Sequence, residues 1–341
     1  MDMPPLNRPY FSPNRGREFT WLLICWIVTA ACSLILVVAW PQTRSLDFVI
    51  YLYQWGASSP VGYFFKALTF LGEDEFFMIF FGIILWCVNK NLGFWTTVML
   101  LTSGIYRGVI KDLTHLERPA LAGVIHPEDT AFPSGHTLTA VTVWGYLAVR
   151  IKKTGFWVWA IFVMVGMGLS RLVLGHHFLG DVLGGFALGL PFLLFFIWLS
   201  VQFVERGWVE KFSVPLLLTL SVVGPVVLTA VIPGADSPKI LGYLAGACAG
   251  YILEKEKVRS ITAAALPLQF VKVILGLAVL FGIIVGLGGV LPSGGPDAAF
   301  AVKMVGFTRY ALGGVWATLL APAVFVALKL TPRESTVSRN F

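Results

Sequence analysis

The stretch from Phe178 to Val201 reads FLGDVLGGFALGLPFLLFFIWLSV, and it decides the fold class of this chain. Its only charged side chain is that of Asp181, near the beginning. A helix needs about 20 consecutive apolar residues to cross a bilayer, so this run predicts a transmembrane helix. An aspartate at the head of such a helix is costly unless it has a partner or a functional role.

The composition of the whole chain agrees with that stretch. Of the 341 residues, 57% are hydrophobic and 13% are charged, and the mean hydropathy is +0.80. Ordinary globular domains carry about 25% charged residues, and here too few polar side chains remain to cover a soluble surface. This excludes a soluble enzyme, a disordered chain and a disulfide scaffold. We attribute the net charge of +7 to membrane topology and not to nucleic acid.

Ten apolar runs follow one another along the chain, and they predict an all-α, polytopic transmembrane helical bundle. The runs are Thr20–Trp40, Phe76–Val88, Phe94–Ile110, Thr137–Val149, Phe156–Leu174, Phe178–Val201, Pro215–Ile232, Ile240–Leu253, Leu268–Leu291 and Ala301–Leu330. A polar linker at 202–212 separates a six-span block, 20–201, from a four-span block, 213–330. The segment Phe48–Leu71 is amphipathic and predicts a helix that lies at the membrane surface or dips in without crossing.

The basic residues predict the orientation of the bundle. With residues 1–19 and 331–341 in the cytoplasm, the inner segments hold fourteen Lys and Arg residues and the outer segments six. The outer six are Arg44, Lys66, Lys111, Arg118, Arg171 and Lys239. Cytoplasmic loops collect basic residues, so this distribution favours a multi-pass protein of the cell (inner) membrane with both termini inside.

Three polar segments adjoin apolar runs on the predicted outer side. They are Lys111–Pro119, Phe132–His136 and Ser170–Asp181. Arginine binds phosphate oxygens in pairs and lysine adds a compact charge, so Lys111, Arg118 and Arg171 are typical of an anion site. Ser134 and Gly135 precede an apolar helix, whose free N–H groups favour a bound anion that glycine lets approach closely. The three segments together predict a phosphate site.

Histidines in the same segments add reactive groups. His177 and Asp181 are four residues apart, so on a helix they share a face. The carboxylate can then accept a hydrogen bond from one ring nitrogen and leave the other free as a nucleophile. His136 is available as a general acid for the leaving oxygen.

These residues resemble the type 2 phosphatidic acid phosphatase (PAP2) superfamily, whose pattern is K-x6-RP, PSGH and SR-x5-H-x3-D. The three motifs read Lys111…Arg118-Pro119, Pro133-Ser134-Gly135-His136 and Ser170-Arg171…His177…Asp181, with every spacing met. The resemblance covers about residues 60–200 and does not reach the last four runs. The stretch that begins Leu71-Gly-Glu-Asp-Glu also looks like the sphingosine-1-phosphate-phosphatase-like branch.

The resemblance implies a lipid phosphatase that hydrolyses a lipid phosphate monoester or diphosphate. It implies that His177 forms a phosphohistidine, that Asp181 orients it and that His136 protonates the leaving group. The phosphate would be bound by Lys111, Arg118, Ser134, Gly135 and Arg171. No metal and no cofactor are expected, and the expected partners are a lipid phosphate and membrane lipids, without nucleic acid.

Two alternatives stay open from the sequence. The first is a lipid phosphotransferase that uses the same site with an alcohol in place of water. The second is a lipid transporter or flippase, suggested by the four additional spans and by Arg309, a charged residue inside the last apolar run. The identity of the lipid and the oligomeric state are left undetermined.

Overall fold

The computed structural model describes residues 43–56, 59–121, 130–204, 209–232, 234, 236–291 and 298–334, together with six positions between 23 and 31. The predicted first span, Thr20–Trp40, therefore lies almost wholly outside the described residues. Every other predicted run is helical. The helices of the first block are α2 (Leu46–Gly56), α3 (Pro60–Thr69), α4 (Asp74–Ile83), α5 (Lys90–Thr114), α6 (Gly135–Ile151), α7 (Thr154–Val173) and α8 (Leu179–Val204).

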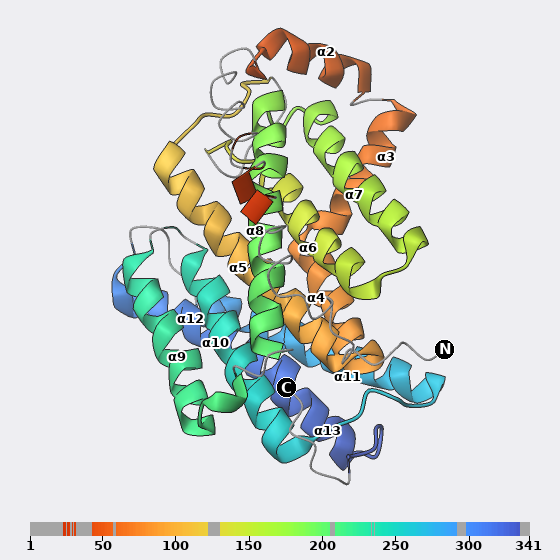
Figure 1. The fold of residues 1–341 in the computed structure, drawn as a ribbon, viewed down its shortest axis with the longest axis vertical. Helices are drawn as coiled ribbons and strands as arrows, with labels where there is room; N and C mark the ends of the chain where they lie inside the picture. The colour runs from red at the N-terminus through yellow and green to blue at the C-terminus, as the bar shows by residue number, and fades with distance from the viewer. Residues whose placement is uncertain are drawn as a thin grey trace.

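A second set of helices follows the linker. They are α9 (Val214–Val231), α10 (Ser237–Leu253), α11 (Leu266–Ile284), α12 (Phe300–Val315) and α13 (Ala321–Ala327). In Figure 1 the first block forms the upper part of an elongated molecule, and the C-terminal helices lie below it. No strand longer than an isolated bridge occurs in the part of the chain that the structure describes.

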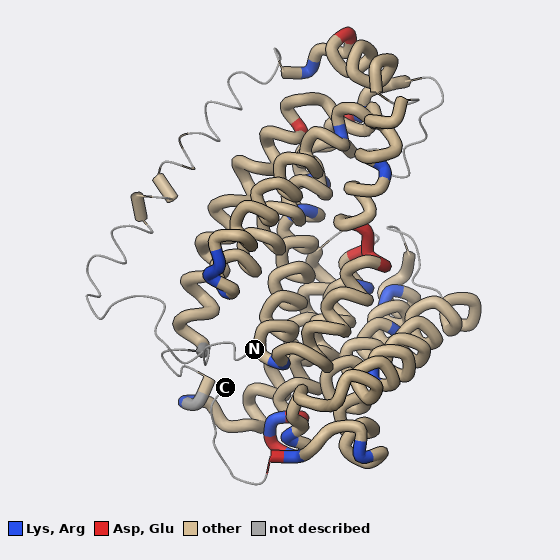
Figure 2. Tube along the Cα trace, turned by 90° about the vertical axis from the view of Figure 1, so that its right-hand side faces the viewer, with Lys and Arg blue, Asp and Glu red and all other residues tan. Residues whose placement is uncertain are grey.

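The helices have the length and composition of membrane spans. Within the described ranges, five are long and apolar enough to cross a bilayer: α7, α8, α9, α11 with its extension to Gly289, and Phe300–Ala327, which joins α12 to α13. Charged residues are sparse along the tube in Figure 2. The protein is therefore an all-α, multi-pass membrane protein.

The segment that the sequence placed at the membrane surface divides into two parts. α2 lies across one end of the bundle (Figure 1), whereas α3 packs along α7. The close approach occurs at Gly166, where an added Cβ would lie 2.4 Å from Leu68 Cδ2. α3 then continues through the short turn Phe70–Gly72 into α4. The second apolar run thus gains length from α3, and a break in the helix remains at Gly72 and Glu73.

A row of glycines joins α10 to α12 in the C-terminal block. Added Cβ atoms would lie 2.2 Å from the Phe307 carbonyl oxygen at Gly242, and 2.0 Å from the Ala311 carbonyl oxygen at Gly246. At Gly250 the Cβ would lie 2.3 Å from the side-chain oxygen of Thr318. Small residues at every fourth position let two membrane helices bring their backbones together, so this pair is held by direct backbone contact.

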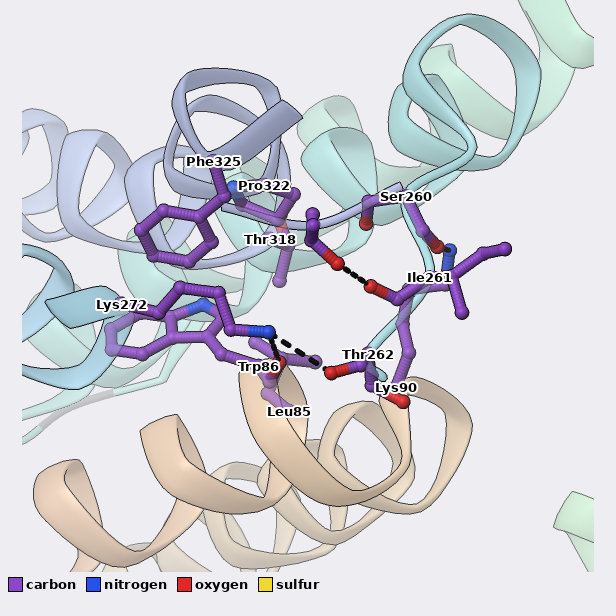
Figure 3. Close-up of a pocket in the computed structure, with 11 residues that line it drawn as sticks. Leu85, Trp86, Lys90, Ser260, Ile261, Thr262, Lys272, Thr318, Pro322 and Phe325 are labelled. Atoms are coloured by element: carbon purple, nitrogen blue, oxygen red, sulfur yellow. Dashed lines mark hydrogen bonds between the residues drawn. The ribbon is translucent and has the colours of Figure 1, made fainter. Parts of the chain in front are cut away.

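The two blocks meet in a polar cluster that we call the Lys272 clamp, formed by Trp86, Lys90, Glu254, Thr262 and Lys272. Lys272 is buried, and its Nζ donates to the carbonyl oxygens of Trp86 at 2.8 Å and Thr262 at 3.0 Å, beside a small pocket (Figure 3). The Lys90 ammonium lies 2.7 Å from a carboxylate oxygen of Glu254. Lys272 thus places a cation at the π-helical turn Ile84–Val88 that ends the helix begun by α4, where terminal carbonyls lack helical partners.

We expect Lys272→Met to lower the free energy of unfolding by about 1–3 kcal/mol, because the buried carbonyl oxygen of Trp86 loses its donor, whereas that of Thr262 keeps a hydrogen bond from Gln269. The measurement is thermal unfolding of the purified protein in detergent. Lys257→Met is the matched control, since that side chain is exposed close to the same seam. Equal melting temperatures for the two variants would contradict a stabilising role for the clamp.

Candidate active site

His177 lies in the turn between α7 and α8, and Asp181 lies on the first turn of α8. The N–H groups of His176 and His177 both donate to the carbonyl oxygen of Arg171, at 2.9 and 3.2 Å. Gly175 has a φ of +73°, a conformation that glycine adopts without a steric penalty. This turn brings His177 Nδ1 to 3.4 Å from Asp181 Oδ2, and both side chains are buried.

The second ring nitrogen of His177 lies beside a guanidinium. His177 Nε2 is 3.4 Å from Nη1 of Arg118, and because a guanidinium only donates, Nε2 is the acceptor. The ring proton then lies on Nδ1, facing Asp181, and the Nε2 lone pair faces Arg118. Burial, followed by the charges of Arg118, Arg171 and Lys111, holds the pKa of His177 well below its usual range. The imidazole is therefore neutral at neutral pH, the form that a nucleophile requires.

Arg44, which the sequence analysis counted only as an outer basic residue, also binds Asp181. Its Nη1 lies 3.3 Å from Asp181 Oδ1, and its Nη2 donates to the Glu117 carbonyl oxygen at 2.5 Å. Oδ2 accepts a second hydrogen bond from the Phe178 N–H at 2.9 Å. Both carboxylate oxygens thus have partners that favour the charged form and fix its orientation.

Lys111 and Arg171 reach the site from α5 and α7, and both side chains are buried. Nζ of Lys111 donates to the Thr130 carbonyl oxygen at 3.2 Å. Nη1 of Arg171 donates to the hydroxyl oxygen of Thr69 on α3 at 2.6 Å, whereas its Nε is buried and has no hydrogen-bond partner. With Arg118, these side chains concentrate positive charge around Nε2 of His177.

The beginning of α6 supplies backbone donors to the same region. Ser134 precedes the helix, and its N–H donates to the Asp181 carbonyl oxygen at 2.9 Å, which joins α6 to α8. A Cβ added at Gly135 would lie 2.7 Å from Nη1 of Arg107. Glycine thus leaves room for a guanidinium from α5 that the sequence analysis did not include.

His136 follows on the first turn of α6 and faces the break between α3 and α4. Its Nε2 lies 3.2 Å from Oε1 of Glu73. His136 also interacts electrostatically with His177 and with Arg171. In the sequence, Glu73 was noted only within the stretch Leu71-Gly-Glu-Asp-Glu that looks like the sphingosine-1-phosphate-phosphatase-like branch. Its position next to Gly72, between two apolar segments, was the feature that could have marked it as a site residue.

The structure thus brings together all eight predicted site residues, His177, His136, Asp181, Lys111, Arg118, Ser134, Gly135 and Arg171. Among the residues that it describes, no group of three or more His, Cys, Asp and Glu side chains is placed to hold a metal ion. The site offers a neutral imidazole nitrogen, a cluster of cations and a second histidine. This arrangement can accept a phosphate group and act on it.

Comparisons with known proteins cover both blocks. The profile described as the PAP2 superfamily matches residues 92–205. A second profile, described as the transmembrane extension of PAP2 superfamily phosphatases, matches residues 238–333. The first match contains all of the predicted site residues.

Individual relatives match part of the chain. Phosphatidylglycerophosphatase B of Bacillus subtilis (strain 168) is 32% identical over 146 residues, which are 38% of this chain and 70% of the relative. A probable sphingosine-1-phosphate phosphatase of Dictyostelium discoideum is 26% identical over 160 residues, 42% of this chain and 39% of the relative. Undecaprenyl-diphosphatase BcrC of B. subtilis is 34% identical over 101 residues, 27% and 51% of the two chains.

A solved structure is also similar, that of a transmembrane PAP2-type phosphatidylglycerolphosphate phosphatase from B. subtilis. It matches with a TM-score of 0.40 and 22% identity over 55% of this chain and 96% of that one. Because the site motifs lie inside the superfamily profile, and because one relative is covered over most of its length at 32% identity, this protein belongs to the PAP2 superfamily of membrane phosphatases.

Proposed function

We propose that this protein hydrolyses a lipid phosphate monoester or diphosphate through a phosphohistidine on His177, without a metal ion. The observation that carries the proposal is the orientation of His177, with Nδ1–H toward Asp181 and the Nε2 lone pair toward Arg118. A phosphate group that binds Arg118 would lie beside this lone pair. The named relatives act on lipid phosphates or a lipid diphosphate, which supports a substrate of that class.

In the first step, Nε2 of His177 attacks phosphorus while the bond from phosphorus to the leaving oxygen breaks. The Asp181 carboxylate stabilises the positive charge that develops on the ring. Lys111, Arg118, Arg171 and the N–H groups at the start of α6 bind the three equatorial oxygens, where negative charge accumulates. His136 gives its proton to the leaving oxygen.

In the second step, water attacks phosphorus, and His136, now neutral, accepts a proton from that water. The bond between phosphorus and Nε2 breaks, inorganic phosphate leaves, and His177 returns to its neutral form. The surrounding cations supply the positive charge that a metal ion provides in other phosphatases. EDTA should therefore leave the activity intact.

We place this site at the non-cytoplasmic face. The segments predicted to lie outside contact one another at one end of the bundle. Arg44 binds Asp181 there, and a Cβ added at Gly234 would lie 3.2 Å from a carboxylate oxygen of Asp112. At the other end, Lys90 binds Glu254, and Ser260 pairs with Arg333. The excess of basic residues at that second end supports its assignment to the cytoplasm.

The test is phosphate release by the purified protein from four lipid classes in detergent: a sphingoid-base phosphate, phosphatidic acid, phosphatidylglycerol phosphate and a polyprenyl diphosphate. Each reaction is run with and without EDTA, and the His177→Ala protein serves as the blank. We expect release from at least one class, unchanged by EDTA and absent in the blank. No release by the wild-type protein, or release that EDTA removes, would overturn the proposal.

A further inference from the structure

The break between α3 and α4 presents Glu73 to the active site. Glu73 has extended backbone angles, φ −84° and ψ 153°, and its N–H donates to the Phe70 carbonyl oxygen at 3.1 Å. An added Cβ at Gly72 would lie 2.9 Å from Cδ2 of His136 and 3.0 Å from Met167. The imidazole of His136 thus lies against the backbone of Gly72, with the Glu73 carboxylate at its tip.

The charges around His136 differ in sign. Burial, together with the charges of Arg171 and Arg107, holds the pKa of His136 below its usual range, and Glu73 acts in the opposite direction. Oε1 of Glu73, 3.2 Å from Nε2, is the carboxylate oxygen that hydrogen bonds to it. A general acid must carry its proton when the leaving oxygen departs, and a carboxylate in contact with the ring favours the protonated form.

We propose that Glu73 is a positioning residue that favours the protonated form of His136 and holds its ring in place for transfer of a proton to the leaving oxygen. This inference rests on the hydrolytic function proposed above. Glu73 accepts the hydrogen bond from Nε2–H, so the proton that is transferred is the one on Nδ1. When the phosphorus–oxygen bond breaks, the leaving oxygen takes that proton, and His136 becomes a neutral imidazole still bound to Glu73.

The first test compares two leaving groups. An alkoxide of a lipid alcohol departs only with a proton, whereas 4-nitrophenolate departs without one. For Glu73→Gln we expect kcat to fall about 30- to 100-fold on a lipid phosphate and less than about threefold on 4-nitrophenyl phosphate, in line with the usual size of general acid catalysis. Glu75→Gln is the matched control, because this exposed carboxylate lies only two residues further along, on the first turn of α4. It should change neither rate by more than about twofold.

Two further measurements use the lipid phosphate alone. The alkaline limb of the pH profile of kcat/KM should move to lower pH in Glu73→Gln, because the imidazolium loses its carboxylate partner and gives up its proton more readily. In the His136→Ala background, Glu73→Gln should add no further loss, since the two residues act as one unit. Glu73→Asp, which keeps the charge, should recover part of the rate.

Equal losses on both substrates, an unmoved pH profile, or a loss that adds to that of His136→Ala would overturn the role of Glu73. Those results would leave the proposed function intact, provided that the wild-type protein releases phosphate and His177→Ala does not. Failure of the wild-type protein on every lipid phosphate would instead overturn the hydrolytic function itself.

Discussion

The His177→Ala protein is expected to release phosphate from a lipid phosphate at least about 10⁴-fold more slowly than the wild-type protein, because the nucleophilic nitrogen is absent. The loss should appear in kcat, since Lys111, Arg118 and Arg171 remain to bind the phosphate group. Single-turnover reaction with labelled substrate should give an acid-labile, alkali-stable label on the wild-type protein and none on the variant.

His176→Ala is the control for this experiment. His176 is adjacent in sequence; its backbone carbonyl oxygen accepts from Arg118 at 3.3 Å, and its side chain interacts electrostatically with Glu73. Alanine keeps that carbonyl, so the activity should fall no more than about tenfold. If His176→Ala lost as much activity as His177→Ala, or if His177→Ala retained the label, the assignment of the nucleophile would be wrong.

The second large effect is expected in the C-terminal block, at the contact between α10 and α12. Gly246→Ala places a methyl group 2.0 Å from the Ala311 carbonyl oxygen, and neither backbone can move without separating the two helices. We expect the free energy of unfolding to fall by about 3 kcal/mol, the upper part of the usual range for overpacking. Thermal unfolding in detergent measures it, and Gly246→Leu should prevent the protein from accumulating in membranes.

Gly282→Ala is the same substitution in a different environment. Nothing lies within 4 Å of a Cβ added at Gly282, which is an exposed position within α11. Alanine is the better helix former by about 1 kcal/mol, so this variant should be unchanged or slightly more stable. A similar loss of stability in both variants would mean that the close approach of α10 and α12 does not limit stability.

Apolar run length was sufficient to predict most of the helices, because in a membrane the backbone must satisfy its own hydrogen bonds and has few alternatives to a helix. Run length could not predict that α3 continues toward α4. The apolar pattern is interrupted by Gly56, Pro60, Glu73 and Asp74. The packing of α3 on α7 was needed to show that α3 and α4 are parts of one segment of the bundle.

In the active site, too, some contacts could be predicted from the sequence and others could not. The spacing of His177 and Asp181 predicted their contact, but the reason given for it was wrong. α8 begins at Leu179, so His177 lies in the bend before the helix, and the turn at Gly175 brings the two side chains together, not a shared helical face. The contacts of Arg44 with Asp181 and of Glu73 with His136 join residues that are 137 and 63 positions apart. No periodicity links such positions, since the contact depends on where helices end and how they pack. Membership of the PAP2 superfamily, by contrast, was predicted from its motifs and is confirmed.

The Lys272 clamp also constrains how this protein can evolve. Its members come from both blocks, and the hydroxyl of Tyr251 on α10 donates to the side-chain oxygen of Asn91 close by. A chain truncated at the linker would lack Glu254, the partner of the Lys90 ammonium, and Lys272, the donor to the Trp86 carbonyl oxygen. Transfer of the C-terminal block to another phosphatase would require compatible residues at positions 86, 90 and 91. In this chain, a change at one of these positions is therefore expected to persist only together with a matching change in the other block.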